Sequence, residues 1–510
     1  MKSNLKKYFD SHRTRLVRTV LILLIGLVGL GITACGTLRG ATSLDSVPAD
    51  ARESLLRVTV TRQGYLFNRP WQQQRPATQT AIGVIVAGGQ VLVNGLLVAD
   101  QRYIELETLD TRRKAPAEVH VVDYEANLAL LRPLDPLLLE GRKPMDLAGD
   151  VAVGDLLSVW QVNPGGVVIP ASGEVTSVEL GAYFQDNHFL TYHLDASLPY
   201  RFNSITLPVV KGNALAGLVL RQNPSGQAVE VVATPVIRHF LEDAGEAPYR
   251  GFPMGAFHYG PTLDPQLRRY IGLPEALTGI YVRKVIRGGP ADEAGLRAGD
   301  VLLRIGDFQL TNTGRYEHPR YGQTSLVHLI RTHYHVGDKV PFQVFRDGGI
   351  LDLEIVLGHR RPEQFLVPPY MVDQAPEHLI VGGLVLQELS MSYLREYGTD
   401  WQANAPIHLL YYQQNQDYLD SDQREKIVII SSVIPTSYTI GFEPISNLEV
   451  LRINGQPIRN LADVPRSLRT PVDGFHRIEL RQHPKLLFLD PAELPLIDEI
   501  ITQRYGIPVR

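Results

Sequence analysis

The chain is poor in cysteine, since Cys35 is the only one among 510 residues. A single cysteine excludes an intramolecular disulfide framework and any Cys-x-x-Cys zinc or redox motif. The sequence also lacks a P-loop, a Gly-x-Gly-x-x-Gly turn after a strand and a His-Glu-x-x-His helix, the motifs of phosphate, dinucleotide and catalytic zinc binding. His333 and His335 stand two residues apart without a carboxylate cluster, so we expect no metal and no cofactor.

Long apolar runs are rare, and the main one lies near the N-terminus. Basic residues precede the uncharged stretch TVLILLIGLVGLGITA, which ends at Cys35. A basic start, a short apolar segment and small residues before a cleavage point are typical of a secretory signal peptide. ITAC resembles a bacterial lipobox, which predicts lipidation of Cys35; an uncleaved anchor helix is the alternative. Gly36 resembles the residue found in lipoproteins sent to the outer membrane, with the inner membrane as the alternative, so we expect a lipid-anchored envelope protein facing the periplasm.

The N-terminal segment is strongly basic, in contrast to the rest of the chain. The first 34 residues carry a net charge of +5, and removing them changes the formal charge of the chain from −4 to −9. An acidic mature chain argues against nucleic acid as a partner. Acyl chains on Cys35 would instead make membrane lipid a partner.

Glycine and proline are abundant, with 44 and 35 residues spread along the chain. From about residue 51 to 242, apolar runs of strand length alternate with Gly, Pro or Asn turns, which predicts a sandwich or barrel. The stretch 359–378 is rich in proline and charge and predicts a linker between two further units.

The strongest local motif is GGPADEAGLRAGDVLLRIGD, from Gly288 to Asp307. Pro290 suits the first turn of a helix, where its missing N–H is harmless. Gly295 and Gly299 permit the bends that return the chain to a strand. The motif closely resembles a PDZ domain, and PDZ domains bind an extended peptide by adding it as a strand to a sheet edge.

The PDZ resemblance implies a loop that holds the peptide carboxylate and a helix that lines the groove. The loop has the bacterial pattern X-Φ-G-Φ, where Φ is apolar, although arginine takes the first apolar position here. For the helix residues, ordinary core packing is the alternative. The peptide-binding residues implied in this way are Tyr249, Arg250, Gly251, Phe252, Leu326, Leu329 and Ile330.

The unit after the linker resembles the second PDZ domain of Deg-type proteases, particularly the plant-like ones. Its central string is IVIISSVIPTSYTIGFEPISNLEVLRINGQPI, and ELPLIDEIITQRYGIPVR resembles the final helix of those proteins. The resemblance implies a docking or assembly surface.

A strand-rich domain followed by two PDZ units resembles the HtrA/Deg family of serine proteases, over nearly all of the mature chain. AIGVIVAGGQVLVNGLLVAD is similar to the family's GSGVIV…VLTNAHVVAD, which puts the catalytic histidine on Leu96. DYEANLALL is similar to D-x-x-x-D-L-A-(L/V)-L, which puts the triad aspartate on Asn127. The stretch DASLPYRFNSITLPVV corresponds to the nucleophile loop of the family but lacks the glycines of that loop. Ser204 or Ile205 takes the position of the serine.

A triad needs a histidine that takes the serine proton and a carboxylate that orients it, and Leu96 cannot accept a proton. The resemblance therefore implies a catalytically inactive member that binds peptides or unfolded envelope proteins, as a chaperone, adaptor or regulatory scaffold in protein quality control. The alternative is an active endopeptidase around Ser204 with a relocated base such as His193. His120 and His188 are further histidines of this domain.

Active family members form trimers through N-terminal aromatic residues, which implies a homotrimer through Tyr65, Phe67 and Trp71, with core packing as the alternative. A mixed oligomer with an active homologue is a further hypothesis. We expect a mostly β fold with some α, a trypsin-like double β-barrel followed by two PDZ domains. The expected boundaries are signal peptide 1–34, tether 35–50, (pseudo)protease domain 51–245, first PDZ domain 246–360, linker 361–379, and second PDZ domain with its C-terminal helix 380–510.

Overall fold

The computed structural model describes residues 49–184, 187–198, 206–223, 227–419 and 424–509. All the described residues belong to one compact unit. Cys35, Ser204 and Ile205 lie outside the described residues. No helix that the structure describes is both long and apolar enough to cross a membrane.

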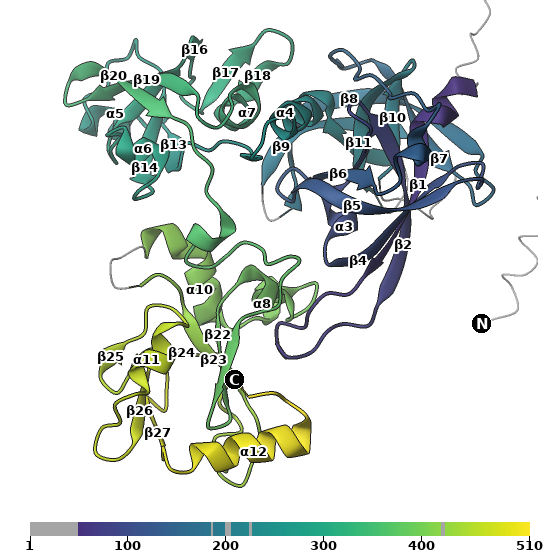
Figure 1. The fold of residues 1–510 in the computed structure, drawn as a ribbon. Helices are drawn as coiled ribbons and strands as arrows, with labels where there is room; N and C mark the ends of the chain where they lie inside the picture. The colour runs from purple at the N-terminus through teal and green to yellow at the C-terminus, as the bar shows by residue number, and fades with distance from the viewer. Residues whose placement is uncertain (1–48, 185–186, 199–205, 224–226, 420–423, 510) are drawn as a thin grey trace, which may run out of the picture. The chain divides into compact units, whose positions relative to one another are not determined.

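The first half of the strand-rich region closes into a six-stranded antiparallel barrel (Figure 1). Its first strand, LLRVTVTR, alternates between buried and partly exposed residues, which is the pattern of a strand with one face toward a core. Closure removes unpaired edges from the sheet. The strands are β1 (Leu55–Arg62), β2 (Ala77–Val86), β3 (Gln90–Val93), β4 (Gln101–Thr108), β5 (Lys114–Asp123) and β6 (Leu128–Pro133).

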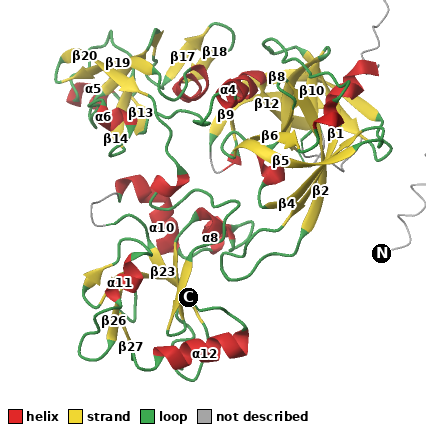
Figure 2. Ribbon diagram, in the orientation of Figure 1, coloured by secondary structure: helices red, strands yellow, loops and turns green. Residues whose placement is uncertain are grey.

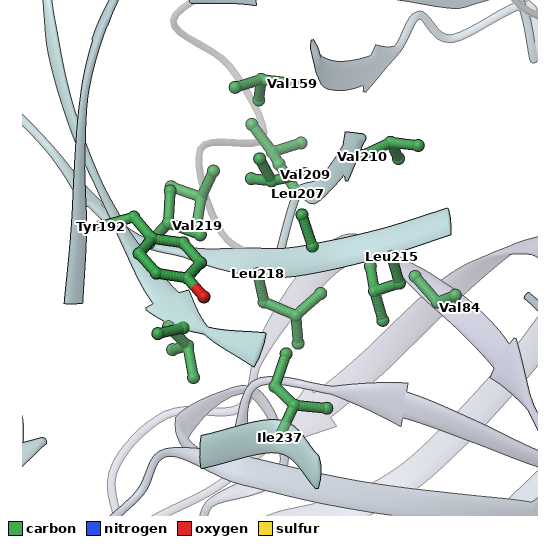
Figure 3. Packing of buried hydrophobic residues seen from close by; sticks show 14 of the residues in the cluster. Val84, Val159, Tyr192, Leu207, Val209, Val210, Leu215, Leu218, Val219 and Ile237 are labelled. Atoms are coloured by element: carbon green, nitrogen blue, oxygen red, sulfur yellow. The ribbon is translucent and has the colours of Figure 1, made fainter. Parts of the chain in front are cut away.

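A second six-stranded barrel follows, and helix α4 (Thr234–Ala244) succeeds its last strand. One buried apolar cluster includes residues of both barrels and of α4. Figure 3 shows Val84 of the first barrel and Ile237 of α4 among residues of the second barrel. The barrels therefore share a core and hold each other in place. The strands are β7 (Leu156–Val162), β8 (Val168–Ala182), β9 (His188–Ala196), β10 (Pro208–Lys211), β11 (Ala214–Gln222) and β12 (Ala228–Ala233).

The first PDZ unit is an antiparallel sheet in the order β13-β14-β15-β19-β20, with β16 paired to β15 and a hairpin of β17 and β18 beside it. At the predicted turn, Asp300 accepts a hydrogen bond from the Arg297 amide at 2.8 Å and forms an ion pair with Arg346 at 2.6 Å. The strands are β13 (Phe257–Pro261), β14 (Ile280–Val285), β15 (Val301–Ile305), β16 (Phe308–Gln309), β17 (Arg315–His318), β18 (Gly322–Ser325), β19 (Lys339–Arg346) and β20 (Gly349–Val356). The helices are α5 (Pro265–Tyr270), α6 (Pro290–Glu293) and α7 (Leu326–His328), which continues as the π-helix η4 (Leu329–His333).

The second PDZ unit has the sheet order β21-β22-β23-β24-β26-β27, with β25 paired to β24. Its strand β22 pairs with β21 on one side and with β23 on the other. The strands are β21 (His378–Val381), β22 (Leu384–Glu388), β23 (Val428–Val433), β24 (Leu448–Ile453), β25 (Gln456–Pro457), β26 (His476–Leu480) and β27 (Leu486–Leu489). The helices are α8 (Met391–Arg395), α9 (Trp401–Asn404), α10 (Ile407–Asn415), α11 (Asp463–Ser467) and the C-terminal α12 (Leu494–Tyr505).

Strands make up most of the regular structure (Figure 2). Short 3-10 helices lie at η1 (Ala49–Ser54), η2 (Pro136–Leu139), η5 (Pro362–Gln364) and η6 (Gln416–Tyr418). The predicted fold class, mostly β with two trypsin-like barrels followed by two PDZ domains, is confirmed.

Candidate functional site

The candidate site begins with the short helix α3 (Gly95–Val98), which follows strand β3 directly. A Cβ atom on Gly95 would lie 3.1 Å from both the Asp123 carbonyl oxygen and the Leu128 nitrogen, so the backbone segments approach each other closely here. The close approach packs Leu97 into the first barrel, where it is fully buried. Leu96 remains partly exposed. The turn thus presents one side chain at the end of the strand, and that side chain is aliphatic.

The structure brings Leu96 and Asn127 together. The Leu96 amide donates a hydrogen bond of 2.8 Å to the Asn127 side-chain oxygen, across 31 positions of sequence. Asn127 is buried and adopts a left-handed backbone conformation, with φ of 56°. Asparagine tolerates that conformation better than most residues. The two positions that the family resemblance assigns to histidine and aspartate are therefore neighbours.

The third predicted position, Ser204 or Ile205, lies outside the described residues, but the next residue is informative. Thr206 accepts a hydrogen bond of 3.2 Å from the Asn94 amide through its hydroxyl oxygen. The Asn94 side chain donates to the Val219 carbonyl at 3.0 Å, so residues of the second barrel reach the start of α3. The Asn94 side-chain oxygen is buried and has no hydrogen-bond partner among the described residues.

The histidines considered as alternative bases lie elsewhere on the barrels. His120 is within 3.0 Å of the Arg132 guanidinium at an exposed position. His188 and His193 belong to β9, and His193 lies 3.6 Å from Glu179. Among the hydrogen bonds of the described residues, none links these three histidines to Leu96 or Asn127.

The loop between β5 and β6, which carries Asn127, is anchored by two buried carboxylates. Asp123 accepts hydrogen bonds of 2.7 Å from the Ala126 amide and from the Tyr249 hydroxyl. Burial, followed by the neighbouring Glu125, raises the pKa of the Asp123 carboxyl. Burial also raises the pKa of the Tyr249 hydroxyl well above its usual value, and Asp123 adds to this shift, so the tyrosine stays a hydrogen-bond donor.

Glu125 forms a buried ion pair with Arg331 of the π-helix in the first PDZ unit. The same guanidinium donates to the Asn187 side-chain oxygen at 2.7 Å and lies 4.4 Å from the centre of the Phe189 ring. The loop of the candidate site is therefore tied to the PDZ unit through a desolvated charge pair.

The residues predicted to form the carboxylate-binding loop, Tyr249 to Phe252, lie against the barrels and helix α4 and not at the end of a peptide groove. Phe252 is fully buried in the cluster shared by the barrels and stacks on the His239 ring at 4.5 Å. Arg250 forms an ion pair of 3.0 Å with Asp243 of α4. With Tyr249 donating to Asp123, these side chains are engaged with the barrels. Gly251, with φ of 78°, makes the bend between α4 and the PDZ unit.

The residues that directly precede β13 are Met254, Gly255 and Ala256, which the sequence analysis missed. Met254 donates its amide to the Gly358 carbonyl at 2.8 Å, and Gly255 lies next to Ile330 of the groove helix. The signal that could have found them is the apolar–Gly–apolar order of MGA, which fits the expected loop pattern without an arginine.

The predicted groove residues Leu326, Leu329 and Ile330 lie in the core of the first PDZ unit, with exposures of 2%, 0% and 4%. Strand β13 pairs only with β14 along its length. The helix therefore packs its apolar residues inward, and β13 forms an edge of the sheet.

The three aromatic residues considered for trimer formation pack within this chain. Tyr65 and Phe67 join an apolar cluster with residues of the second PDZ unit, and the Phe67 amide donates to the Glu396 carboxylate at 3.0 Å. Trp71 packs in a neighbouring cluster beside the C-terminal helix, with its ring 6.2 Å from that of His378.

Comparisons with known proteins agree with this architecture. The family models described as PDZ domain match residues 262–357 and 367–510. "Protease Do-like 4, mitochondrial" of Arabidopsis thaliana is 24% identical over 449 residues, 86% of this chain and 81% of that protein. "Protease Do-like 2, chloroplastic" of the same organism is 26% identical over 460 residues, 89% of this chain and 74% of that protein. The solved structure "HtrA-type protease AlgW with decapeptide" aligns with a TM-score of 0.47 at 20% identity, over 61% of this chain and 97% of its own.

The relatives extend over both barrels and both PDZ units, and the family models cover each PDZ unit separately. The chain has the trypsin-like serine-protease fold followed by two PDZ domains, and it is similar to HtrA/Deg-type proteases along most of its length.

Proposed function

We propose that this chain is a non-proteolytic HtrA/Deg-type protein that captures extended or C-terminal peptide segments through its PDZ domains. The observation that carries the proposal is Leu96, which stands at the histidine position of the triad and has no atom that accepts a proton. In the mechanism of a Ser-His-Asp triad, the histidine imidazole takes the proton of the nucleophilic serine. Without a base, a serine hydroxyl is a weak nucleophile.

Asn127 supports the same conclusion. Its oxygen still accepts a hydrogen bond from the neighbouring turn, but it lacks the negative charge that stabilises an imidazolium. Effects of triad residues are strongly non-additive, so repairing one position is not expected to restore cleavage.

Peptide capture is supported by the edge strand β13 of the first PDZ domain. Its residues pair with β14 on one side, and an extended peptide can add to the other side through main-chain hydrogen bonds. Met254 to Ala256, directly before β13, are placed to hold the terminal carboxylate. The second PDZ domain differs. Its strand β22 lies two strands before β24, as β13 lies two strands before β15, and β22 already pairs with β21 on its other side.

We place this function in the bacterial cell envelope, with Cys35 acylated and the protein facing the periplasm, at the outer membrane. The role is that of a chaperone, adaptor or regulatory scaffold, alone, as a homotrimer or with an active homologue. Metabolic labelling with a fatty acid tests the anchor, since Cys35→Ala should lose the label. Affinity purification of the tagged protein from its host tests the mixed oligomer.

The decisive assay compares casein cleavage by the full chain, by Ser204→Ala and by the double variant Leu96→His/Asn127→Asp. We expect no turnover above background in any of them. Turnover by the native chain that disappears in Ser204→Ala would instead establish an active endopeptidase.

Peptide capture is tested separately with the full chain on an array of C-terminal peptides, each paired with its C-terminally amidated form. We expect binding that amidation weakens, because the loop before β13 would lose its carboxylate. An array with no bound peptide would contradict the capture role while leaving the protease result unaffected.

A further inference from the structure

The second PDZ domain contains a cavity of about 900 Å³ whose lining is strongly basic. It lies between the start of β23, strand β24 with its partner β25, and helix α11. All of its lining residues belong to the segment matched by the PDZ family model. Six basic side chains line it: Arg424, Lys426, Arg452, Arg459, Arg466 and Arg481.

Among the lining residues that the structure describes, two are carboxylates, Glu449 and Asp463, which leaves a formal excess of four positive charges in this set. This concentration is unusual in a chain whose net charge is −4. Arginine is suited to such a site, because its planar guanidinium stays charged and binds carboxylates with two parallel hydrogen bonds.

The two carboxylates hold four of the arginines in position without neutralising them. Glu449 is buried and binds Arg424 at 2.8 Å and Arg481 at 2.7 Å, one guanidinium on each oxygen. It also accepts a hydrogen bond from the Tyr412 hydroxyl. Each of these contacts orients a cation, and one negative charge is shared between two positive ones.

Asp463 repeats the arrangement at the start of α11. It forms ion pairs with Arg466 and, at 3.5 Å, with Arg459, and it also accepts the Arg459 amide at 2.9 Å. The side chains of these two arginines are 59% and 43% exposed. Most of their hydrogen-bonding capacity therefore faces the solvent.

The remaining two cations have no carboxylate partner among the described residues. Arg452 donates to the Gly455 carbonyl at 3.1 Å. Lys426 donates to the main-chain carbonyls of Glu363 and Phe365, at 2.6 and 2.9 Å. Carbonyl dipoles hold these side chains in place, and the carboxylates of Glu388 and Glu425 also act on the charge of Lys426 from a distance.

The cavity is separate from the edge of β22, where β21 is paired, so it is not the usual strand-addition groove of a PDZ domain. Its lining also includes Val428, Val450 and Ile458. An apolar floor under convergent cations fits a short segment that combines carboxylates with apolar side chains. A planar membrane surface does not enter a concave site of this kind, and its volume lies within the range of pockets that enclose a ligand.

From this arrangement we propose that the cavity between β23, β24 and α11 is a binding site for an acidic peptide segment of a partner protein. The site is independent of the proposed function, because capture at β13 and the loss of proteolysis involve other residues. Recognition uses the arginine cluster for carboxylates and the apolar floor for the side chains between them.

The test is fluorescence anisotropy of the full chain in neutral detergent, with a labelled peptide of alternating Glu and Leu. The matched ligand replaces Glu by Gln. We expect binding of the Glu peptide only, weakened at least about tenfold by raising NaCl from about 50 to about 500 mM. The double variant Arg452→Gln/Arg459→Gln should weaken it at least about tenfold as well, because two close charges are lost.

Arg112→Gln in the first barrel is the control, since that side chain is 84% exposed and remote in sequence; it should bind like the native chain. Arg452→Glu is a second variant, at a side chain whose contact is with one carbonyl, and it should abolish binding while circular dichroism stays native. Equal affinity of native and Arg452 variants would overturn the proposal. Arg452-dependent binding of phosphatidylglycerol vesicles without peptide binding would also overturn it, in favour of a lipid headgroup site.

Discussion

Arg331 offers the sharpest test of how the barrels and the first PDZ domain depend on each other. Its guanidinium is 11% exposed, the Glu125 carboxylate is 8% exposed, and the two side chains form an ion pair. Arg331→Met removes one charge and leaves Glu125 buried without its cation. Breaking a buried pair in this way costs about 3–5 kcal/mol of unfolding free energy. The Asn187 and Phe189 contacts of the arginine are lost as well.

The assay is calorimetry of the full chain, with the transition of the barrels followed by the fluorescence of the buried Trp160. For a domain of this size the predicted cost corresponds to a fall in Tm of roughly 6–20 °C. The double variant Arg331→Met/Glu125→Leu replaces the pair by apolar side chains. It should recover most of the loss, because neither residue is then left charged and unpaired.

Two results would refute the reasoning. A loss below about 1 kcal/mol for Arg331→Met would mean that water reaches Glu125 and that the pair behaves like a surface salt bridge. A double variant as unstable as the sum of the single variants would mean that packing of the arginine, and not its charge, stabilises the contact.

Three further outcomes are expected. Burial, aided by a stacked neighbouring histidine, lowers the pKa of His239 from 6.5 to about 4. The unfolded chain therefore binds the proton more readily than the folded chain, and Tm should fall as the pH drops from 6.5 to about 4. His239→Phe should flatten this dependence of Tm on pH. Tyr249→Phe should cost about 1–3 kcal/mol in urea unfolding, because buried Asp123 loses a donor. Gly217→Ala should cost about 1–3 kcal/mol, since its Cβ would lie 2.3 Å from a valine side chain, whereas Gly149→Ala, in open space, should be neutral.

Sequence motifs predict the structure best where a motif reflects local geometry. The strand followed by a tight turn at Val93 to Leu97 uses a small residue, Gly95, and buried apolar residues, and both are visible in the sequence. The PDZ motif from Gly288 to Asp307 likewise encodes its own helix, bends and strand. These features follow from neighbouring residues, so the fold class could be predicted from them.

The peptide-binding loop could not be located in this way. The apolar–Gly–apolar pattern is complete at Gly255, and Arg250 interrupts it at Gly251, but both glycines lie close before the first strand of the unit and both are candidates by position. The burial of Phe252 among residues of the barrels shows that the loop at Gly251 is not the one that directly precedes the edge strand. That burial depends on contacts between segments far apart in the chain. A local pattern contains no information of this kind.

The charged contacts were hidden for the same reason. Glu125 and Arg331 are 206 positions apart, and each looks like an ordinary surface residue in its own segment. The basic cavity is likewise assembled from the start of β23, from β24 and from α11. Only the sheet order brings these elements to one place, so its excess charge could not be recognised from the overall composition.

The pairing of β21 with β22 has a consequence for valency. Strand β22 lies two strands before β24 in its sheet, as β13 lies two strands before β15, and β22 is flanked on both sides whereas β13 is flanked on one. Of these two equivalent strands in the described part of the chain, β13 is the one open to strand addition by an unfolded client. Binding one long client by strand addition at several points therefore requires several chains side by side, so the apparent affinity should rise steeply with their surface density.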